Sequence, residues 1–155
     1  MTDITEGQAA PAFDLSTDGD GRVTLDGLKG KSVVLYFYPK ADTPGCTTEG
    51  LDFSALADQF AAANAVVIGV SRDAVKKLDR FKAKHDLKVV LGSDEDGAVC
   101  EAYGVWIMKK LYGQEYMGVE RATFLIDGAG VVRRVWRSVK VKGHAEQVLD
   151  ALHSL

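Results

Sequence analysis

The chain has 155 residues, 46% of them hydrophobic, which suffices for one domain with a substantial core, expected over residues 1–155. Its formal net charge of -3 argues against nucleic acid or an anionic membrane surface as the main partner, because both need a concentrated basic footprint. Two cysteines cannot build a disulfide framework, and residues 1–10 lack the charged and apolar stretches of a signal peptide. We therefore expect a cytoplasmic protein without a membrane span.

The order of apolar runs and turn signals predicts an α/β protein. The turn-rich segment 18–21 separates short stretches at 13–15 and 22–24, which predicts a β-hairpin before the main fold. Residues 33–38 form an unbroken apolar and aromatic run, typical of a buried central strand. The later elements are expected as helices at 46–63, 73–84, 97–103 (capped by Ser93 and Asp94) and 143–152, strands at 66–70 and 89–91, and a hairpin of 122–126 with 131–136.

One cysteine falls at the start of a predicted helix. Thr43 is a suitable N-cap and Pro44 suits the first helical position, which places Cys46 in the first turn. Free backbone N–H groups and the positive end of the helix dipole favour a thiolate there, which is the nucleophilic form. The dipole contributes only roughly 0.3–1 kcal/mol, so a fixed cation must help. Cys46 is therefore expected to serve chemistry rather than packing.

The segment around Cys46 resembles a known family. Pro39, Thr43 and Cys46 spell P-x-x-x-T-x-x-C, which is similar to the active-site motif of the peroxiredoxins, thiol peroxidases that reduce hydroperoxides with one cysteine. The fuller string at 38–49 resembles the bacterioferritin-comigratory (PrxQ) branch, and blocks at 93–97, 103–106 and 116–127 agree with it in order. The resemblance runs nearly end to end. It implies a thioredoxin-like fold with the hairpin as an N-terminal extension.

The resemblance also implies how the site would act. Attack by the Cys46 thiolate on a peroxide oxygen would make a sulfenic acid and move negative charge along the O–O axis. Arg121 matches the arginine that lies beside the reactive thiolate in the family, although the residues alone would favour a surface arginine. The Thr43 hydroxyl and the N–H groups of Gly45 and Cys46 are expected to donate toward the peroxide.

Two further residues have implied roles. Pro39 is expected to shield the thiolate from water, and Glu49 to orient Arg121, with an exposed helical glutamate as the alternative. Thr43 retains its simpler role as an N-cap, worth about 1 kcal/mol, beside the role toward peroxide.

The cysteine that would complete a two-cysteine cycle is missing from its usual places. PrxQ proteins often carry a resolving cysteine at the position of Leu51 here, and others at that of Lys82. Cys100 lies on a different predicted helix among small and apolar residues, where an inert buried cysteine is common. We therefore expect a one-cysteine cycle, with thioredoxin, glutaredoxin or a low-molecular-weight thiol as reductant and Cys100 as the alternative resolving residue. PrxQ proteins are often monomeric, so a monomer is expected.

Competing chemistries fit the sequence poorly. A tyrosine phosphatase would need an arginine where Asp52 stands, and no C-x-x-C pair is present for disulfide exchange. His85, His144 and His153 are scattered singly and are expected at the surface, so neither a metal nor a cofactor is predicted. A redox sensor that signals through Cys46 oxidation remains the alternative to a peroxidase.

Overall fold

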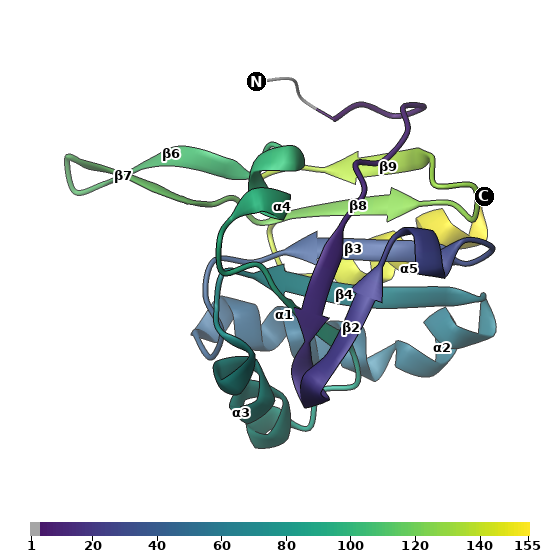
Figure 1. Cartoon of the computed structure of the whole chain (residues 1–155), viewed down its shortest axis with the longest axis horizontal. Coiled ribbons are helices and arrows are strands. Elements are labelled where there is room, and N and C mark those ends of the chain that lie inside the picture. The colour runs from purple at the N-terminus through teal and green to yellow at the C-terminus, as the bar shows by residue number, and fades with distance from the viewer. Residues whose placement is uncertain (1–3) are drawn as a thin grey trace.

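The computed structural model describes residues 4–155, and its centre is a seven-stranded mixed sheet (Figure 1). The strand order is β2-β1-β5-β4-β3-β8-β9, while β6 and β7 form a separate two-stranded sheet. The strands are β1 Asp14–Thr17, β2 Gly21–Thr24, β3 Ser32–Phe37, β4 Ala65–Ser71, β5 Val90–Ser93, β6 Trp106–Leu111, β7 Gln114–Val119, β8 Ala122–Ile126 and β9 Val132–Trp136. The helices are α1 Pro44–Ala55, α2 Ala57–Ala62, α3 Val75–His85, α4 Ala98–Ala102 and α5 His144–His153. The predicted α/β class is confirmed.

The central strand is β3, and its apolar run explains its position. It pairs in parallel with β4 and antiparallel with β8, so both of its edges are covered. Val34 and Tyr36 point into one hydrophobic cluster, whereas Val33, Leu35 and Phe37 point into another. Because neighbouring side chains of a strand face opposite sides of a sheet, the two clusters lie on opposite faces. A strand buried on both faces must be apolar throughout, as predicted from the sequence.

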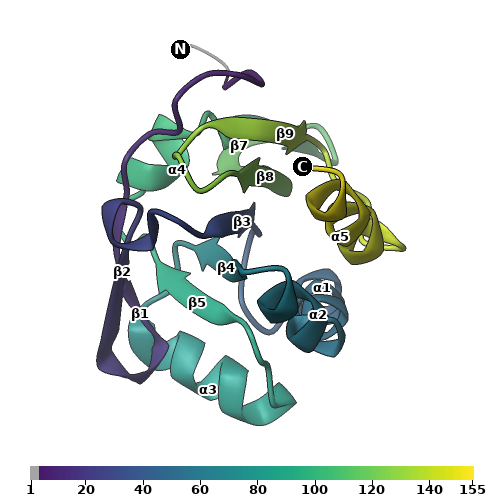
Figure 2. The same ribbon diagram turned by 90° about the vertical axis from the view of Figure 1, so that its right-hand side faces the viewer.

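Different segments cover the two faces. Figure 2 shows α1, α2 and α5 together on one side of the sheet, and α4 on the other. The first cluster contains Phe53 from α1, Phe60 from α2 and Val148 from α5. The second contains Cys100 from α4 and Phe13 from the segment before β1. Cys46 belongs to the first cluster, so the two cysteines belong to cores on opposite faces of the sheet.

The helix predicted over 46–63 is wrong in one respect, because it is two helices. Leu56 separates α1 from α2 with φ -102° and ψ 8°, and its N–H bonds to the carbonyl of Phe53, three residues back, at 3.1 Å. This tighter turn redirects the chain, and the rings of Phe53 and Phe60 still meet in the core with centroids 5.9 Å apart.

The predicted cap of the helix at 97–103 is half right. Asp94, which is 3% exposed, accepts the N–H groups of Val99 and Cys100 at 3.1 and 2.8 Å, so it does satisfy the start of α4. Ser93 does not, because its hydroxyl donates to the carbonyl of Asp73. The hairpin expected at the N-terminus is present as β1 and β2, and β1 also joins the main sheet through β5.

The largest feature that sequence reasoning missed is the hairpin of β6 and β7. Its strands pair only with each other among the described residues, and most of their side chains are exposed, so no alternation between core and solvent marks them. The available sequence signal was Gly113, because a two-residue hairpin turn needs residues with positive φ. In the structure Tyr112 and Gly113 have φ of 52° and 78°.

No helix in the described part of the chain is both long and apolar enough to cross a membrane. The prediction that residues 1–10 contain no signal peptide includes residues 1–3, which lie outside the described residues.

Candidate active site

Cys46 lies in the first turn of α1, as predicted, directly beyond the loop that follows β3. Its side chain is buried, and the residue is 2% exposed. The guanidinium of Arg121 donates from Nη2 to Cys46 Sγ at 3.4 Å. Arg121 precedes β8, which pairs with β3, so neighbouring strands bring the arginine beside the cysteine.

The guanidinium of Arg121 also contacts a carboxyl group, in addition to the sulfur of Cys46. Arg121 donates from Nη1 to Glu49 Oε1 at 2.7 Å, and Glu49 is 1% exposed. Cys46 and Glu49 are three residues apart on α1, so both face the same side of the helix. One arginine therefore bridges a sulfur and a carboxylate on one helical face. The alternative of an exposed glutamate is wrong.

Burial and charge act in opposite directions within this cluster. Burial raises the pKa of Glu49 to about 7, even though the charge and hydrogen bond of Arg121 lower it. Glu49 Oε2 is buried without a hydrogen-bond partner in the described structure, which fits a carboxyl that readily holds a proton. For Arg121, burial lowers the pKa, but the charges of Glu49 and Cys46 and their hydrogen bonds together raise it. The guanidinium is thus charged at every relevant pH.

Gly45 makes room for this arrangement. A Cβ atom added at Gly45 would lie 3.1 Å from Arg121 Nη2, closer than side-chain carbons normally approach. The close approach of Arg121 to the start of α1 therefore favours glycine at this position, a reason that the sequence did not reveal.

Thr43 occupies the N-cap position of α1, but its hydroxyl does not cap the helix. Its Oγ1 donates to the carbonyl of Lys40 at 2.7 Å, so the expected N-cap bond is absent among the described contacts and the hydroxyl hydrogen is already used. The oxygen lone pairs of Thr43 remain available to accept a hydrogen bond. The structure thus corrects the expected donor to an acceptor. Pro39 is exposed, and its shielding of Cys46 stays a prediction.

The loop between β3 and α1 is tied to the body of the protein. Asp73 Oδ2 accepts the N–H of Ala41 at 2.7 Å, and it also accepts the hydroxyl of Ser71. Asp42, with a left-handed φ of 63°, contacts Lys84 and His85 of α3 at 2.9 and 2.8 Å. These contacts fix the residues that lead into α1 and help to hold Cys46 in place.

His144 is buried, not at the surface as predicted, and it lies near Arg121. It is 3% exposed, and its Nε2 is 2.7 Å from Thr123 Oγ1. Phe53 and Trp136 meet its ring edge-on. Burial, followed by the positive charge of Arg121, lowers the pKa of His144 to about 4, so it is neutral at pH 7. The sequence signal was Thr123, a polar residue within an apolar strand.

Cys100 has the properties of a structural cysteine. It is fully buried, and burial and a hydrogen bond with Asp94 raise the pKa of its thiol. Neither Cys100 nor Cys46 forms a disulfide, and the sheet separates the two clusters to which they belong. A bond between them would require a large rearrangement, because disulfides need Cα atoms within about 7 Å.

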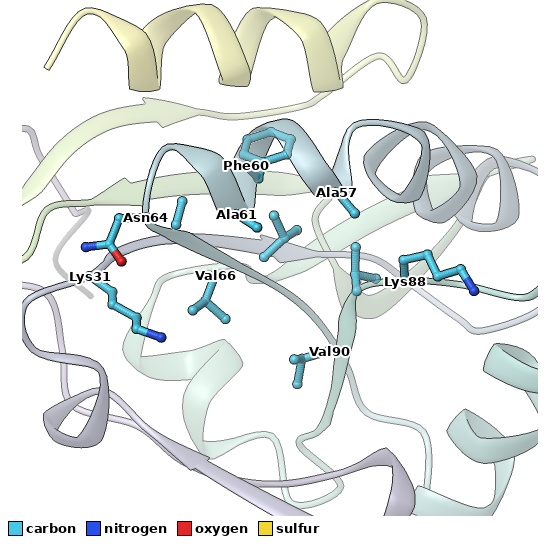
Figure 3. Close-up of a pocket in the computed structure, with 11 residues that line it drawn as sticks. Lys31, Ala57, Phe60, Ala61, Asn64, Val66, Lys88 and Val90 are labelled. Carbon is cyan, nitrogen blue, oxygen red and sulfur yellow. The ribbon is translucent and has the colours of Figure 1, made fainter.

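Other features of the described chain carry less chemistry. A hollow of about 310 Å³ at the opposite end of the sheet is lined by Phe60, Val66 and Val90, with Lys31 and Lys88 at its two ends (Figure 3). It contains neither cysteine. Within residues 4–155, no group of three or more His, Cys, Asp or Glu side chains is arranged to hold a metal ion.

Comparison with known proteins adds independent information. A model described as the AhpC/TSA family matches residues 6–135. The putative peroxiredoxin bcp of Coxiella burnetii is 50% identical over 149 residues, which cover 96% of this chain and 99% of that protein. Peroxiredoxin Bcp of Bacillus subtilis is 48% identical, covering 98% of this chain and 97% of that protein.

Solved structures agree in fold. PrxQ of Xylella fastidiosa gives a TM-score of 0.94 at 41% identity, with 99% of this chain and 98% of that chain covered. The bacterioferritin comigratory protein of Xanthomonas campestris, studied for its alkyl peroxide reduction activity, gives 0.88 at 48% identity, with coverage of 92% and 90%. The predicted thioredoxin-like fold is confirmed.

We expect His144 and Glu49 to contribute opposite slopes to the pH dependence of the free energy of unfolding. On folding, the pKa of His144 falls from 6.5 to about 4, so the unfolded chain binds the extra proton and stability rises with pH across that window. The pKa of Glu49 rises from 4.5 to about 7, so the folded chain holds the extra proton and stability falls as pH rises across that range. Each contribution is roughly 3 kcal/mol.

Urea unfolding at a series of pH values separates the two terms. His144→Asn should leave a stability that falls more steeply with pH than in the unsubstituted protein, whereas Glu49→Gln should leave one that rises. His153→Asn, at an exposed position, is the control and should not change the slope. If the free energy of unfolding varies with pH in the same way for all four proteins, neither buried group titrates as described.

Proposed function

Because the chain belongs to the AhpC/TSA family and is a peroxiredoxin of the Bcp (PrxQ) type, a thiol-dependent peroxidase, we propose that Cys46 is its peroxidatic cysteine. The observation that carries this assignment is the contact of Arg121 with Cys46 Sγ at 3.4 Å in a buried site. The substrates would be hydrogen peroxide and organic hydroperoxides.

The chemical step balances at Cys46. The thiolate attacks one peroxide oxygen, the S–O bond forms and the O–O bond breaks, so that sulfur is oxidised and the peroxide is reduced. The other oxygen leaves as hydroxide or alkoxide and takes up a proton to give water or an alcohol. Cys46 is left as a sulfenic acid.

Arg121 supports both stages of this attack. Its charge stabilises the thiolate, and its guanidinium is already oriented by Glu49 when negative charge shifts onto the peroxide oxygens. Donors that are fixed before the reaction stabilise the transition state most, because no reorganisation is needed at that moment. Glu49 thus acts through Arg121, as a positioning residue.

The start of α1 supplies the remaining polar groups. The N–H groups of Gly45 and Cys46 lie in the first turn, where no carbonyl of the helix can pair with them, and we assign them as donors to the peroxide. The lone pairs of Thr43 would accept the hydrogen of the hydroperoxide O–H, since the Thr43 hydrogen is bound to Lys40. Pro39 would limit water near the thiolate.

The reductant is external in this proposal. Cys100 belongs to the core on the other face, and the two positions that hold resolving cysteines in related proteins carry Leu51 and Lys82. The Nζ of Lys82 also forms an ion pair with Asp18 Oδ2 at 2.8 Å. Thioredoxin, glutaredoxin or a low-molecular-weight thiol would therefore reduce the Cys46 sulfenic acid. We propose a monomeric, single-domain, cytoplasmic enzyme.

Replacement of the nucleophile gives the first test of this function. Cys46→Ser should abolish peroxide consumption with dithiothreitol as reductant, because a serine hydroxyl is neither ionised nor a comparable nucleophile. The measurement is hydroperoxide loss in a catalase-free assay, with circular dichroism to confirm folding. Retention of a substantial part of the rate would refute the assignment and leave Cys46 at most a sensor.

The role of Arg121 is tested by removing its side chain. Arg121→Ala should slow oxidation of Cys46 in a single turnover by roughly 10²–10³-fold, the range found for loss of one such donor. Stopped-flow fluorescence gives this rate. Arg134→Ala is the matched control, since Arg134 lies over the ring of Trp136 and is half-exposed. Equal rates for the two variants would place the catalytic cation elsewhere.

Cys100→Ser separates the one-cysteine cycle from its alternative. Turnover with dithiothreitol should remain nearly unchanged, while stability falls because a hydroxyl replaces a thiol in an apolar site. Oxidation of the unsubstituted protein should produce no internal crosslink. A Cys46–Cys100 peptide in high yield, with faster overoxidation of the variant, would show instead that Cys100 resolves Cys46.

A further inference from the structure

The hairpin of β6 and β7, which we call the arm (residues 106–119), projects beyond the body of the molecule (Figure 1). An isolated two-stranded hairpin gains little stability in water. Five of the seven exposed large apolar side chains of the described residues belong to it; they are Met108, Leu111, Tyr112, Tyr116 and Met117. Such a concentration marks an interaction surface.

The base of the arm adjoins the site of Cys46. A hollow of about 480 Å³ is lined by Pro39 and Lys40 of the loop before α1 and by Trp106, Tyr116 and Met117 of the arm. Lys109 lines it too, and burial, followed by the charge of Arg121, lowers its pKa. A macromolecule bound to the arm would therefore lie beside Pro39 of the motif and Val119, which is two residues before Arg121.

The charges around the arm indicate the chemistry of the occupant. Arg72 lies over the ring of Trp106, 4.4 Å from its centroid, and joins Lys40, Lys109 and Lys110 around the hollow and the arm. The hollow and the arm contain two carboxylates, Glu95 and Glu115, and Glu115 lies 3.6 Å from Lys110. The local charge is therefore positive, although the chain as a whole carries a net charge of -3. The patch is thus apolar with a cationic rim, and it complements an acidic partner with an apolar contact surface.

The proposed reaction indicates which kind of partner would bind this surface. Cys46 is 2% exposed and Cys100 belongs to the opposite core, so in the proposed cycle a thiol from outside the chain has to approach the sulfenic acid. The hollow at the base of the arm places a bound partner beside Pro39 of the motif that contains Cys46. A second copy held permanently on the arm would cover the hollow beside Cys46 and hinder that access. A partner that binds only transiently leaves the hollow accessible between encounters.

We propose that the arm, with Lys40 and Arg72 at its base, is the docking surface for an acidic protein dithiol that reduces oxidised Cys46. The inference rests on the proposed function. A thiolate of the partner attacks Cys46 Sγ, an S–S bond forms, and the S–O bond breaks with loss of hydroxide. The hydroxide takes the proton of the partner's second thiol and leaves as water, and the thiolate so formed attacks the partner sulfur of the mixed disulfide. This releases Cys46 as a thiolate, while the dithiol becomes a disulfide and the sulfenic acid has gained two electrons.

The test compares reductants rather than peroxides. Met108→Ser/Met117→Ser removes two exposed side chains that face each other across the arm. With reduced thioredoxin, or with glutaredoxin if that is the protein that works, the KM for the reductant should rise about tenfold or more. Turnover with dithiothreitol and the single-turnover oxidation of Cys46 should stay within about twofold of the unsubstituted values. Leu155→Ser, an equally exposed apolar residue at the C-terminus, is the control and should change none of them.

A charge reversal provides a second, independent variant. Lys110→Glu should raise the same KM, and the difference should shrink at high salt, because exposed charges are screened. Lys88→Glu is its match, since Lys88 is also exposed and ion-paired, with Asp86 as Lys110 is with Glu115, but lines the other hollow, shown in Figure 3. Circular dichroism and Tm confirm that each variant folds.

Several outcomes would overturn the proposal. One is an unchanged KM for the protein reductant in both arm variants. Another is an equal loss of turnover with dithiothreitol as reductant. A third is that small thiols, but neither thioredoxin nor glutaredoxin, reduce the unsubstituted protein. A dimer in sedimentation equilibrium that the arm variants disrupt would make the arm a subunit interface instead. Failure of the unsubstituted protein to consume peroxide even with dithiothreitol would refute the proposed function itself, which is a different result.

Discussion

The contact of one guanidinium with two acid groups is the interaction on which the site depends. Arg121 reaches Cys46 at 3.4 Å and Glu49 at 2.7 Å, in a place where both partners are almost fully buried. A buried negative charge is costly unless it is paired, so in the proposed mechanism Arg121 stabilises the thiolate and Glu49 orients Arg121. Burial raises the pKa of Glu49 to about 7, so this carboxyl is partly protonated near neutral pH and only partly neutralises the guanidinium.

The fold supplies this contact through the order of its strands. β3 ends where the loop to α1 begins, and β8 lies beside β3 in antiparallel register, so the residue before β8 arrives next to the first turn of α1. Gly45 leaves space for the guanidinium, and Asp73 and Asp42 hold the loop. The site is thus built from the loop after β3, the residue before β8 and the first turn of α1.

Much of this arrangement could be predicted from the sequence, for physical reasons. An apolar run such as 33–38 has few alternatives to a buried strand, and Pro44 marks the start of a helix because its missing N–H costs nothing there. Arg121 was found only through the family resemblance, since nothing local distinguishes it from a surface arginine. The burial of His144 depends on a tertiary contact with Thr123, 21 residues away, so the local sequence around His144 does not encode it. The hydrogen bond of Thr43 to Lys40 is local, but an N-cap bond was an equally good use of the same hydroxyl. The arm escaped prediction because its strands lack a buried face.

In the proposed cycle Cys46 Sγ is the first atom to be oxidised, and Cys100 stays reduced. The most direct measurement is peptide mass spectrometry after one equivalent of an organic hydroperoxide in the presence of dimedone, which labels sulfenic acids. We expect the dimedone adduct on the peptide that contains Cys46 and an unmodified thiol on the peptide that contains Cys100. Labelling of Cys100 with Cys46 unmodified, or no labelling while peroxide is consumed, would contradict the account.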